Sequence, residues 1–100
     1  MKYKSIQTTV DGIKFSSKKE AARYKQLRLL EQCHLIKDLE LQPSFKLEVN
    51  GVKICSYRAD FQYIEEGRKI TEDVKGFLTP AYRLKKKLML ACHGITILET

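Results

Sequence analysis

The stretch that decides the fold, residues 57–76, reads YRADFQYIEEGRKITEDVKG. Two apolar-rich runs flank turn-forming residues 65–68, so the stretch predicts a β-hairpin. Asp60 falls near the middle of the first strand, and Asp73 falls near the end of the second. Because side chains alternate along a strand, Asp73 and Lys75 share one face. Pairing across the hairpin is expected to bring Asp60 within reach of that face.

Two acids and a lysine on one patch are what a metal-dependent phosphodiesterase site requires. Carboxylate oxygens bind a hard cation such as Mg²⁺, and a lysine places positive charge near the attacking water or the scissile phosphate. A simpler interpretation is that Asp73 and Lys75 form a solvated ion pair of little energetic value. Apolar neighbours on both strands argue against it, because an acid among core residues is costly unless paired or metal-bound. These neighbours are Ala59, Phe61, Tyr63, Ile70 and Val74.

The composition describes a globular chain with a basic balance. Apolar residues make up 43% and charged residues 31%, and no run approaches the roughly 18 apolar residues of a membrane span. The net charge of +7 favours nucleic acid as the partner, ahead of an acidic membrane surface. The three cysteines are widely separated, which favours reduced thiols in a cytoplasm over a zinc site or disulfides.

Two local signals organise the N-terminal third. The dipeptide Asp11-Gly12 between apolar residues predicts a two-residue hairpin turn. Residues 16–20 then begin a helix that we expect to reach about Cys33, because good helix formers fill it. Its inner stripe has helical spacing. The stripe comprises Ala21, Tyr24, Leu27 and either Leu30 or Glu31.

Glu20 in the first turn of this helix has two interpretations. It stands three residues after Ser17, so the pair can form a capping box. It also precedes Tyr24 and Leu27 at helical spacing, which directs its side chain along the buried stripe. A carboxylate there can reach a metal held by the sheet. The two roles do not exclude each other.

Three predicted strands follow. The first two cover residues 35–41 and 44–49, with Pro43 between them. A proline restricts the residue before it, so Gln42 is expected to be extended. An Asn-Gly dipeptide then predicts another hairpin turn, after which a strand runs over residues 52–65 and enters the central hairpin.

A second helix is expected over residues 81–93, since Pro80 suits a first helical turn and Gly94 suits a helix stop. Leu84 and Leu88 are expected to face inward. The residues expected around the rest of this helix are Tyr82, Arg83, Lys85, Lys86 and Lys87.

The last predicted element is a strand over residues 95–98, nearly all apolar and therefore expected in the sheet interior. The predicted order is hairpin, helix, three strands, helix and strand. All of it fits one domain, residues 1–100.

This order and its acids together resemble the restriction-endonuclease-like core of the PD-(D/E)XK nucleases, and more closely a family of small phage- and prophage-encoded proteins of that superfamily. The resemblance rests on five motifs in register: residues 11–20 (DGIKFSSKKE), 41–43 (LQP), 57–61 (YRADF), 72–76 (EDVKG) and 82–87 (YRLKKK). The proline of the superfamily name is Ala59 here. The resemblance implies an α/β (α+β) fold, an N-terminal hairpin and then αβββαβ, with a central mixed sheet flanked by two helices.

The resemblance also implies roles for the site residues. Asp60 and Asp73 would bind the metal, and Glu20 would join them directly or through water. Lys75 would orient and activate the attacking water, and the main-chain carbonyl of Val74 would complete the coordination. The implied cation is Mg²⁺, with Mn²⁺ as a substitute. Glu72, on the opposite face from Asp73, is expected to have a supporting role.

Basic residues near this site are candidates for DNA contact. Tyr82 and Lys85 lie three apart on one helix face, which favours those two for phosphate binding. The alternative is a solvated helix face, which suits at least one or two of the lysines. The full candidate set is Arg58, Tyr82, Arg83, Lys85 and Lys86.

Together these expectations predict a metal-dependent DNA endonuclease that is structure-selective or weakly sequence-selective, with branched DNA as one candidate substrate. A phage or prophage protein of this kind would act in the bacterial cytoplasm, in recombination, replication or packaging. One site cuts one strand, so paired cuts would require a homodimer. A non-catalytic nucleic-acid-binding module and a protein-interaction module on the same fold are the alternatives. A binder gains nothing from acids that repel phosphate, and an interaction protein would show little salt-dependent DNA affinity.

Overall fold

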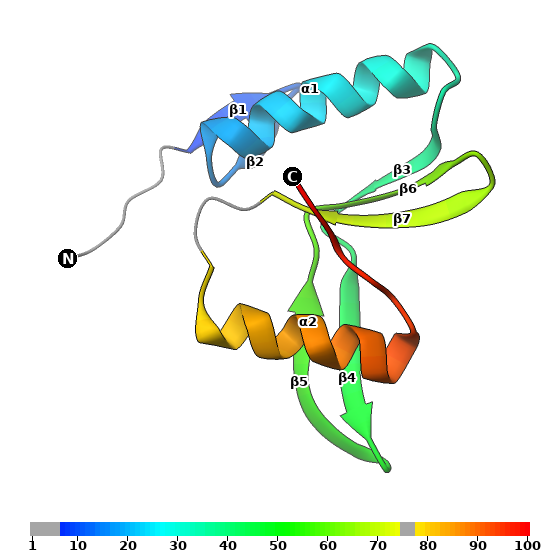
Figure 1. Ribbon diagram of the computed structural model, residues 1–100. Helices are drawn as coiled ribbons and strands as arrows, with labels where there is room; N and C mark the ends of the chain where they lie inside the picture. The colour runs from blue at the N-terminus through cyan, green and yellow to red at the C-terminus, as the bar shows by residue number, and fades with distance from the viewer. Residues whose placement is uncertain (1–6, 75–77) are drawn as a thin grey trace.

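The computed structural model describes residues 7–74 and 78–100. The protein has a mixed α+β fold with a central sheet and two helices (Figure 1). The elements in chain order are β1 (Thr8–Val10), β2 (Ile13–Phe15), α1 (Lys18–Gln32), β3 (Lys37–Leu41), β4 (Ser44–Val49), β5 (Val52–Arg58), β6 (Phe61–Glu65), β7 (Arg68–Asp73), α2 (Pro80–His93) and β8 (Leu98–Glu99). No helix within these ranges is long and apolar enough to cross a membrane.

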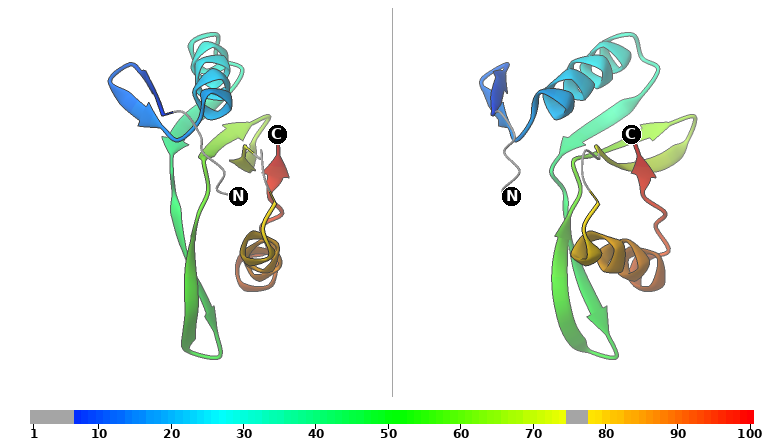
Figure 2. Two further views of the ribbon diagram at one scale, coloured as in Figure 1. Left: turned by 90° about the vertical axis from the view of Figure 1, so that its left-hand side faces the viewer. Right: turned by 60° about the vertical axis from the view of Figure 1, so that its left-hand side comes forward.

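The central sheet has the strand order β3-β6-β7-β8 and is mixed, because β8 runs parallel to β7 while the other pairs are antiparallel. Strands β4 and β5 form a separate two-stranded ribbon, and β1 and β2 form a short hairpin. Helix α1 lies at one end of the molecule near β1 to β3, and α2 lies at the other end beside the ribbon (Figures 1 and 2).

Local turn chemistry explains the three hairpins. Residues 11–12, 50–51 and 66–67 all have positive φ angles, as a type I′ turn requires. The Asp-Gly and Asn-Gly turns are therefore confirmed, and so is the central hairpin between β6 and β7. Each turn places the strands on either side of it in antiparallel register.

Helix α1 also follows its sequence signals. Ser17 is the N-cap and its side chain accepts a hydrogen bond from the backbone N–H of Glu20 at 3.1 Å. The predicted inner stripe is confirmed, since Ala21, Tyr24 and Leu27 are buried. They pack with Phe61 and Tyr63 of β6 and with other residues into one core.

The expectation of one continuous strand over residues 52–65 is wrong. The chain leaves the ribbon at Arg58 and enters the central sheet at Phe61, so Asp60 lies in the break and not in the middle of a strand. Gln42 is not extended, because its φ is 52°. Its N–H donates to the Asp60 carbonyl at 2.9 Å, and the chain turns here to pass from β3 into the ribbon.

The orientation expected for α2 is confirmed for Leu88, which packs against the second core cluster, and is wrong for Leu84 and Tyr82. Tyr82 and Met89 are its buried residues, whereas Leu84 is 57% exposed. Tyr82 packs with Leu47 and Tyr57 of the ribbon in the second core cluster. The aromatic ring buries more apolar area than a leucine while its hydroxyl keeps a hydrogen bond, so the Tyr82 face of the helix turns inward.

The last strand is shorter and less central than expected. β8 covers only residues 98–99 and occupies an edge of the sheet. Ile97 is buried in the second core, but Leu98 is 45% exposed. The segment before β8 is apolar because Ile95 and Ile97 pack against the second core cluster, not because sheet neighbours enclose it.

Candidate functional site

Asp60 and Asp73 lie opposite each other at the end of the central hairpin. Phe61 pairs with Glu72, so the antiparallel register places Asp60 opposite Asp73, and the Asp60 N–H donates to the Glu72 carbonyl at 3.2 Å. The Asp60 carboxylate accepts a hydrogen bond from the Val74 N–H at 2.7 Å. The strand break at Asp60 therefore holds its side chain against the end of β7.

Glu20 reaches this region from the first turn of α1, where it follows the Ser17 cap and turns its side chain inward. Its backbone N–H is capped by Ser17, while its side chain is buried and accepts from the Ser16 hydroxyl at 3.4 Å. Its other oxygen, Oε1, is buried without a hydrogen-bond partner in the part of the chain that the structure describes. A carboxylate oxygen left in this state is costly unless a ligand satisfies it.

The charges of the three acids affect one another. Burial raises the pKa of Asp60 above its ordinary value, and the neighbouring Glu20 raises it further. Hydrogen bonds with Asp73 and with the Val74 N–H oppose this rise in the Asp60 pKa. Acids from α1, from the β5–β6 break and from β7 therefore meet at one place.

The donor set fits a hard divalent cation. Mg²⁺ and Mn²⁺ prefer carboxylate and carbonyl oxygens, and here three carboxylates meet, one with an unpartnered oxygen. No preformed group of three His, Cys, Asp or Glu side chains at metal-binding spacing occurs within residues 7–74 and 78–100.

Two of the predicted site residues follow Asp73 directly. Val74 is half-buried and its N–H is taken by Asp60, which leaves its carbonyl as the group predicted to bind metal. Lys75, the predicted water-activating lysine, lies outside the described residues. Its role stays a prediction.

A polar pocket of about 640 Å³ opens beside Asp60 and Asp73. Of the predicted DNA-binding residues, Arg58, Tyr82 and Lys85 line it. Arg83 and Lys86 do not, because they project from another face of α2. Lys86 instead pairs with Glu99 at 3.1 Å. The other lining residues are Ser44, Ser56, Tyr57, Thr79 and Ala81.

Tyr57 is a site residue that the sequence analysis did not single out. Its hydroxyl donates to the Asp73 carboxylate, and burial together with this bond raises the pKa of the phenol. Tyr57 therefore stays neutral and acts as a donor that positions Asp73. It stands three residues before Asp60 in the YRADF motif, so its motif position was the available signal.

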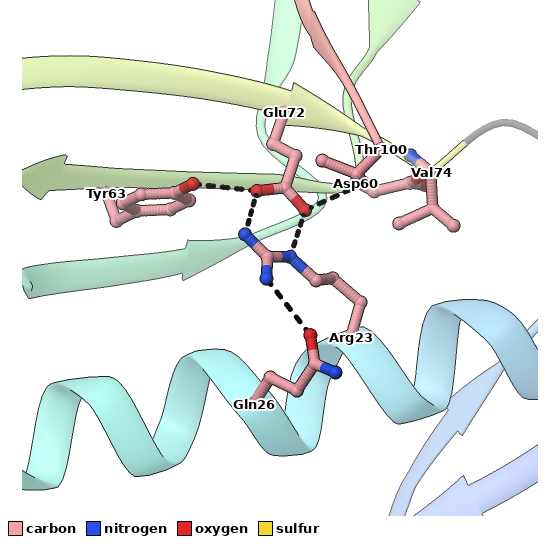
Figure 3. Close-up of polar contacts among 7 residues, drawn as sticks. All are labelled: Arg23, Gln26, Asp60, Tyr63, Glu72, Val74 and Thr100. Carbon is pink, nitrogen blue, oxygen red and sulfur yellow. Dashed lines mark hydrogen bonds and ion pairs between the residues drawn. The ribbon is translucent and has the colours of Figure 1, made fainter.

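Glu72 belongs to a separate buried network (Figure 3). Its carboxylate is 0% exposed and receives Arg23 Nε at 2.7 Å and Arg23 Nη2 at 2.9 Å. Tyr63 and Thr100 complete the set with hydroxyl hydrogen bonds of 2.7 and 3.1 Å. The network ties β7 to α1, β6 and the residue after β8, and so supports the strand that carries Asp73.

The structure therefore defines a mixed α+β domain that carries acidic residues at the end of its central hairpin. The chain belongs to the family described as "Protein of unknown function (DUF1064)", whose model matches residues 1–94. The comparisons with curated proteins and with solved structures give no match.

The raised pKa of Asp60 predicts a pH-dependent stability in the absence of metal. Its stabilising contribution is present below the ordinary aspartate pKa of 3.8 and is lost as the pH rises through the higher pKa of the folded state. Asp60→Asn is therefore expected to gain thermal stability relative to the wild type in EDTA as the pH rises from 3.8 through the higher pKa of the folded state. Calorimetry from acid to neutral pH measures the difference. A constant difference at all pH values would contradict the prediction.

Proposed function

We propose that this protein is a metal-dependent DNA endonuclease with a restriction-endonuclease-like core. The observation that carries the proposal is the meeting of Glu20, Asp60 and Asp73, with one buried glutamate oxygen unpartnered among the described residues. A protein that only binds nucleic acid has no use for three such acids. The resemblance to the small phage and prophage nucleases, with five motifs in order, supports the same activity.

The acids and the Val74 carbonyl would hold Mg²⁺, or Mn²⁺ in its place. The bound cation supplies Lewis-acid polarisation of a phosphate oxygen and a lower pKa for water. Asp73 is positioned by Tyr57, and Asp60 by the Val74 N–H, so both carboxylates are oriented before substrate binds. Lys75 would orient the attacking water.

Cations around the pocket would bind the DNA backbone. Arg58 from β5 and Lys85 from α2 line the pocket beside Asp60, where each can neutralise a phosphate next to the scissile one. Tyr82 contributes its ring to the wall, while its hydroxyl donates to Glu99 at 2.7 Å. Arg83 and Lys86 face elsewhere, so we assign them no direct contact with the scissile strand.

We propose that the enzyme is structure-selective or weakly sequence-selective, with branched DNA as a candidate substrate. A single site cuts one strand, so paired cuts would need a homodimer. The chain would then act in the cytoplasm of a bacterial host, as a phage or prophage protein.

The decisive experiment is cleavage of linear duplex, single-stranded and four-way-junction DNA with Mg²⁺ or Mn²⁺, comparing the wild type with Asp73→Ala. We expect metal-dependent cutting that disappears in the folded variant. If the wild type cuts none of these substrates and the variant binds DNA equally well, the nuclease is excluded and a binding module remains. If neither protein shows salt-dependent DNA binding, an interaction protein remains.

Removing the Tyr57 hydroxyl is a finer test of the same site. Tyr57→Phe is expected to weaken Mg²⁺ activation about 10- to 100-fold, because the donor that orients Asp73 is lost. The cleavage rate as a function of Mg²⁺ concentration measures the effect. Tyr63→Phe is the matched control, since it removes a hydroxyl bonded to the buried Glu72 instead. Equal losses in the two variants would assign Tyr57 a structural role only.

A further inference from the structure

A second hollow, of about 410 Å³, lies along a different face of α2 from the acid pocket. The helix contributes Tyr82, which also lines the acid pocket, together with Arg83, Lys86, Lys87 and Leu90, which share one face at spacings of three and four residues. The chain after the helix forms the opposite wall, and residues 94–97 of it belong to no helix or strand. We refer to this hollow as the α2 groove.

The floor of the α2 groove is aliphatic. Leu78, Leu90, Ile95 and Ile97 line it, and Leu78 and Leu90 are 44% and 57% exposed. Neighbouring exposed leucines around a hollow are typical of a surface that binds a partner, because their burial releases water from apolar area.

The rim of the α2 groove is positively charged. Neither Arg83 nor Lys87 has an ion-pair partner in the described part of the chain. Lys86 shares Glu99 with the Tyr82 hydroxyl. Three cations thus surround the hollow against one acid, so an anionic ligand complements it.

We propose that the α2 groove binds a short acidic segment of a partner protein, with a leucine, isoleucine or phenylalanine anchor in the hollow and carboxylates on Arg83 and Lys87. A peptide fits because the aliphatic floor can take an apolar side chain while the basic rim takes carboxylates. A nucleic-acid strand fits less well, because aliphatic walls give no stacking surface for bases and the Tyr82 ring is buried. The α2 groove shares Tyr82 with the acid pocket, but this proposal does not rest on the proposed nuclease activity.

The probe is a phage-displayed library of random dodecapeptides, selected on the folded full-length protein without metal or DNA. We expect the selected peptides to combine an aliphatic or aromatic residue with two or more nearby carboxylates. A labelled copy of the strongest peptide is then titrated against variants by fluorescence anisotropy. Leu90→Glu and Lys87→Glu should each weaken binding about tenfold or more, since each removes a contact and adds repulsion.

The helix offers a matched control. Leu84 is 57% exposed, as Leu90 is, but it does not line the α2 groove. Leu84→Glu should leave peptide affinity unchanged. Selection of no acidic and apolar peptide, or equal weakening by Leu84→Glu and Leu90→Glu, would overturn the proposal. So would loss of DNA binding in Leu90→Glu with peptide binding intact, which would assign the groove to nucleic acid.

Discussion

Arg23→Ala is expected to destabilise the protein by about 3–5 kcal/mol, because it leaves the fully buried Glu72 carboxylate without its charge partner. Both arms of the Arg23 guanidinium reach Glu72, at 2.7 and 2.9 Å, and Arg23 itself is 25% exposed. A domain of this size is stable by about 5–15 kcal/mol, so the loss is a large fraction of the whole. Urea unfolding followed by circular dichroism measures it.

Arg28→Ala on the same helix is the control. Arg28 pairs with Glu31 at the same 2.7 Å, but the pair is exposed to solvent, and such surface pairs contribute little to stability. Adding Glu72→Gln to Arg23→Ala should recover part of the lost stability, since the unpaired charge is then removed. If Arg23→Ala and Arg28→Ala lowered the free energy of unfolding equally, burial of Glu72 would not make its ion pair more important for stability than an exposed pair.

Asp60→Asn is expected to reduce metal-dependent DNA cleavage by about 10³-fold, equivalent to about 4 kcal/mol of transition-state stabilisation. The amide can still accept the Val74 N–H bond but carries no charge for a cation. The loss of activity should therefore occur in a protein that is folded and, near neutral pH without metal, more stable than the wild type. Cleavage rates at saturating Mg²⁺ and thermal unfolding on the same preparation test both parts.

Asp38→Asn is the control for charge. Asp38 is exposed on β3, and its φ of 56° suits asparagine as well as aspartate. Its cleavage rate should match the wild type. A cleavage rate for Asp60→Asn within a few-fold of that for Asp38→Asn would remove Asp60 from the catalytic set.

Local signals explain what could be predicted of the fold. The Asp-Gly and Asn-Gly turns and the Ser17 cap depend on a few neighbouring residues, so the sequence identifies them. The strand break at Asp60 and the positive φ of Gln42 depend on how two sheets meet. The inward turn of Tyr82 depends on the ribbon beneath α2, which no helical periodicity reveals.

The candidate site likewise has some features that the sequence predicts and others that it does not. The register of one hairpin is enough to place Asp60 opposite Asp73, and helical spacing is enough to direct Glu20 inward. The Tyr57 bond to Asp73 and the Arg23 pair with Glu72 join separate elements, so spacing alone cannot predict them. Tertiary packing also decided that Lys85 lines the acid pocket while Arg83 and Lys86 line the α2 groove.

The mixed pairing of the central sheet has a consequence for how the chain folds. The three hairpins close through two-residue turns and can form early, whereas β3 must find β6, and β8 must find β7, across long intervening segments. Asp60 and Asp73 come together when the β6–β7 hairpin closes, whereas Glu20 belongs to α1 and joins them only when α1 packs against the sheet. We therefore expect the third carboxylate to join the other two late, when most of the apolar surface is already buried.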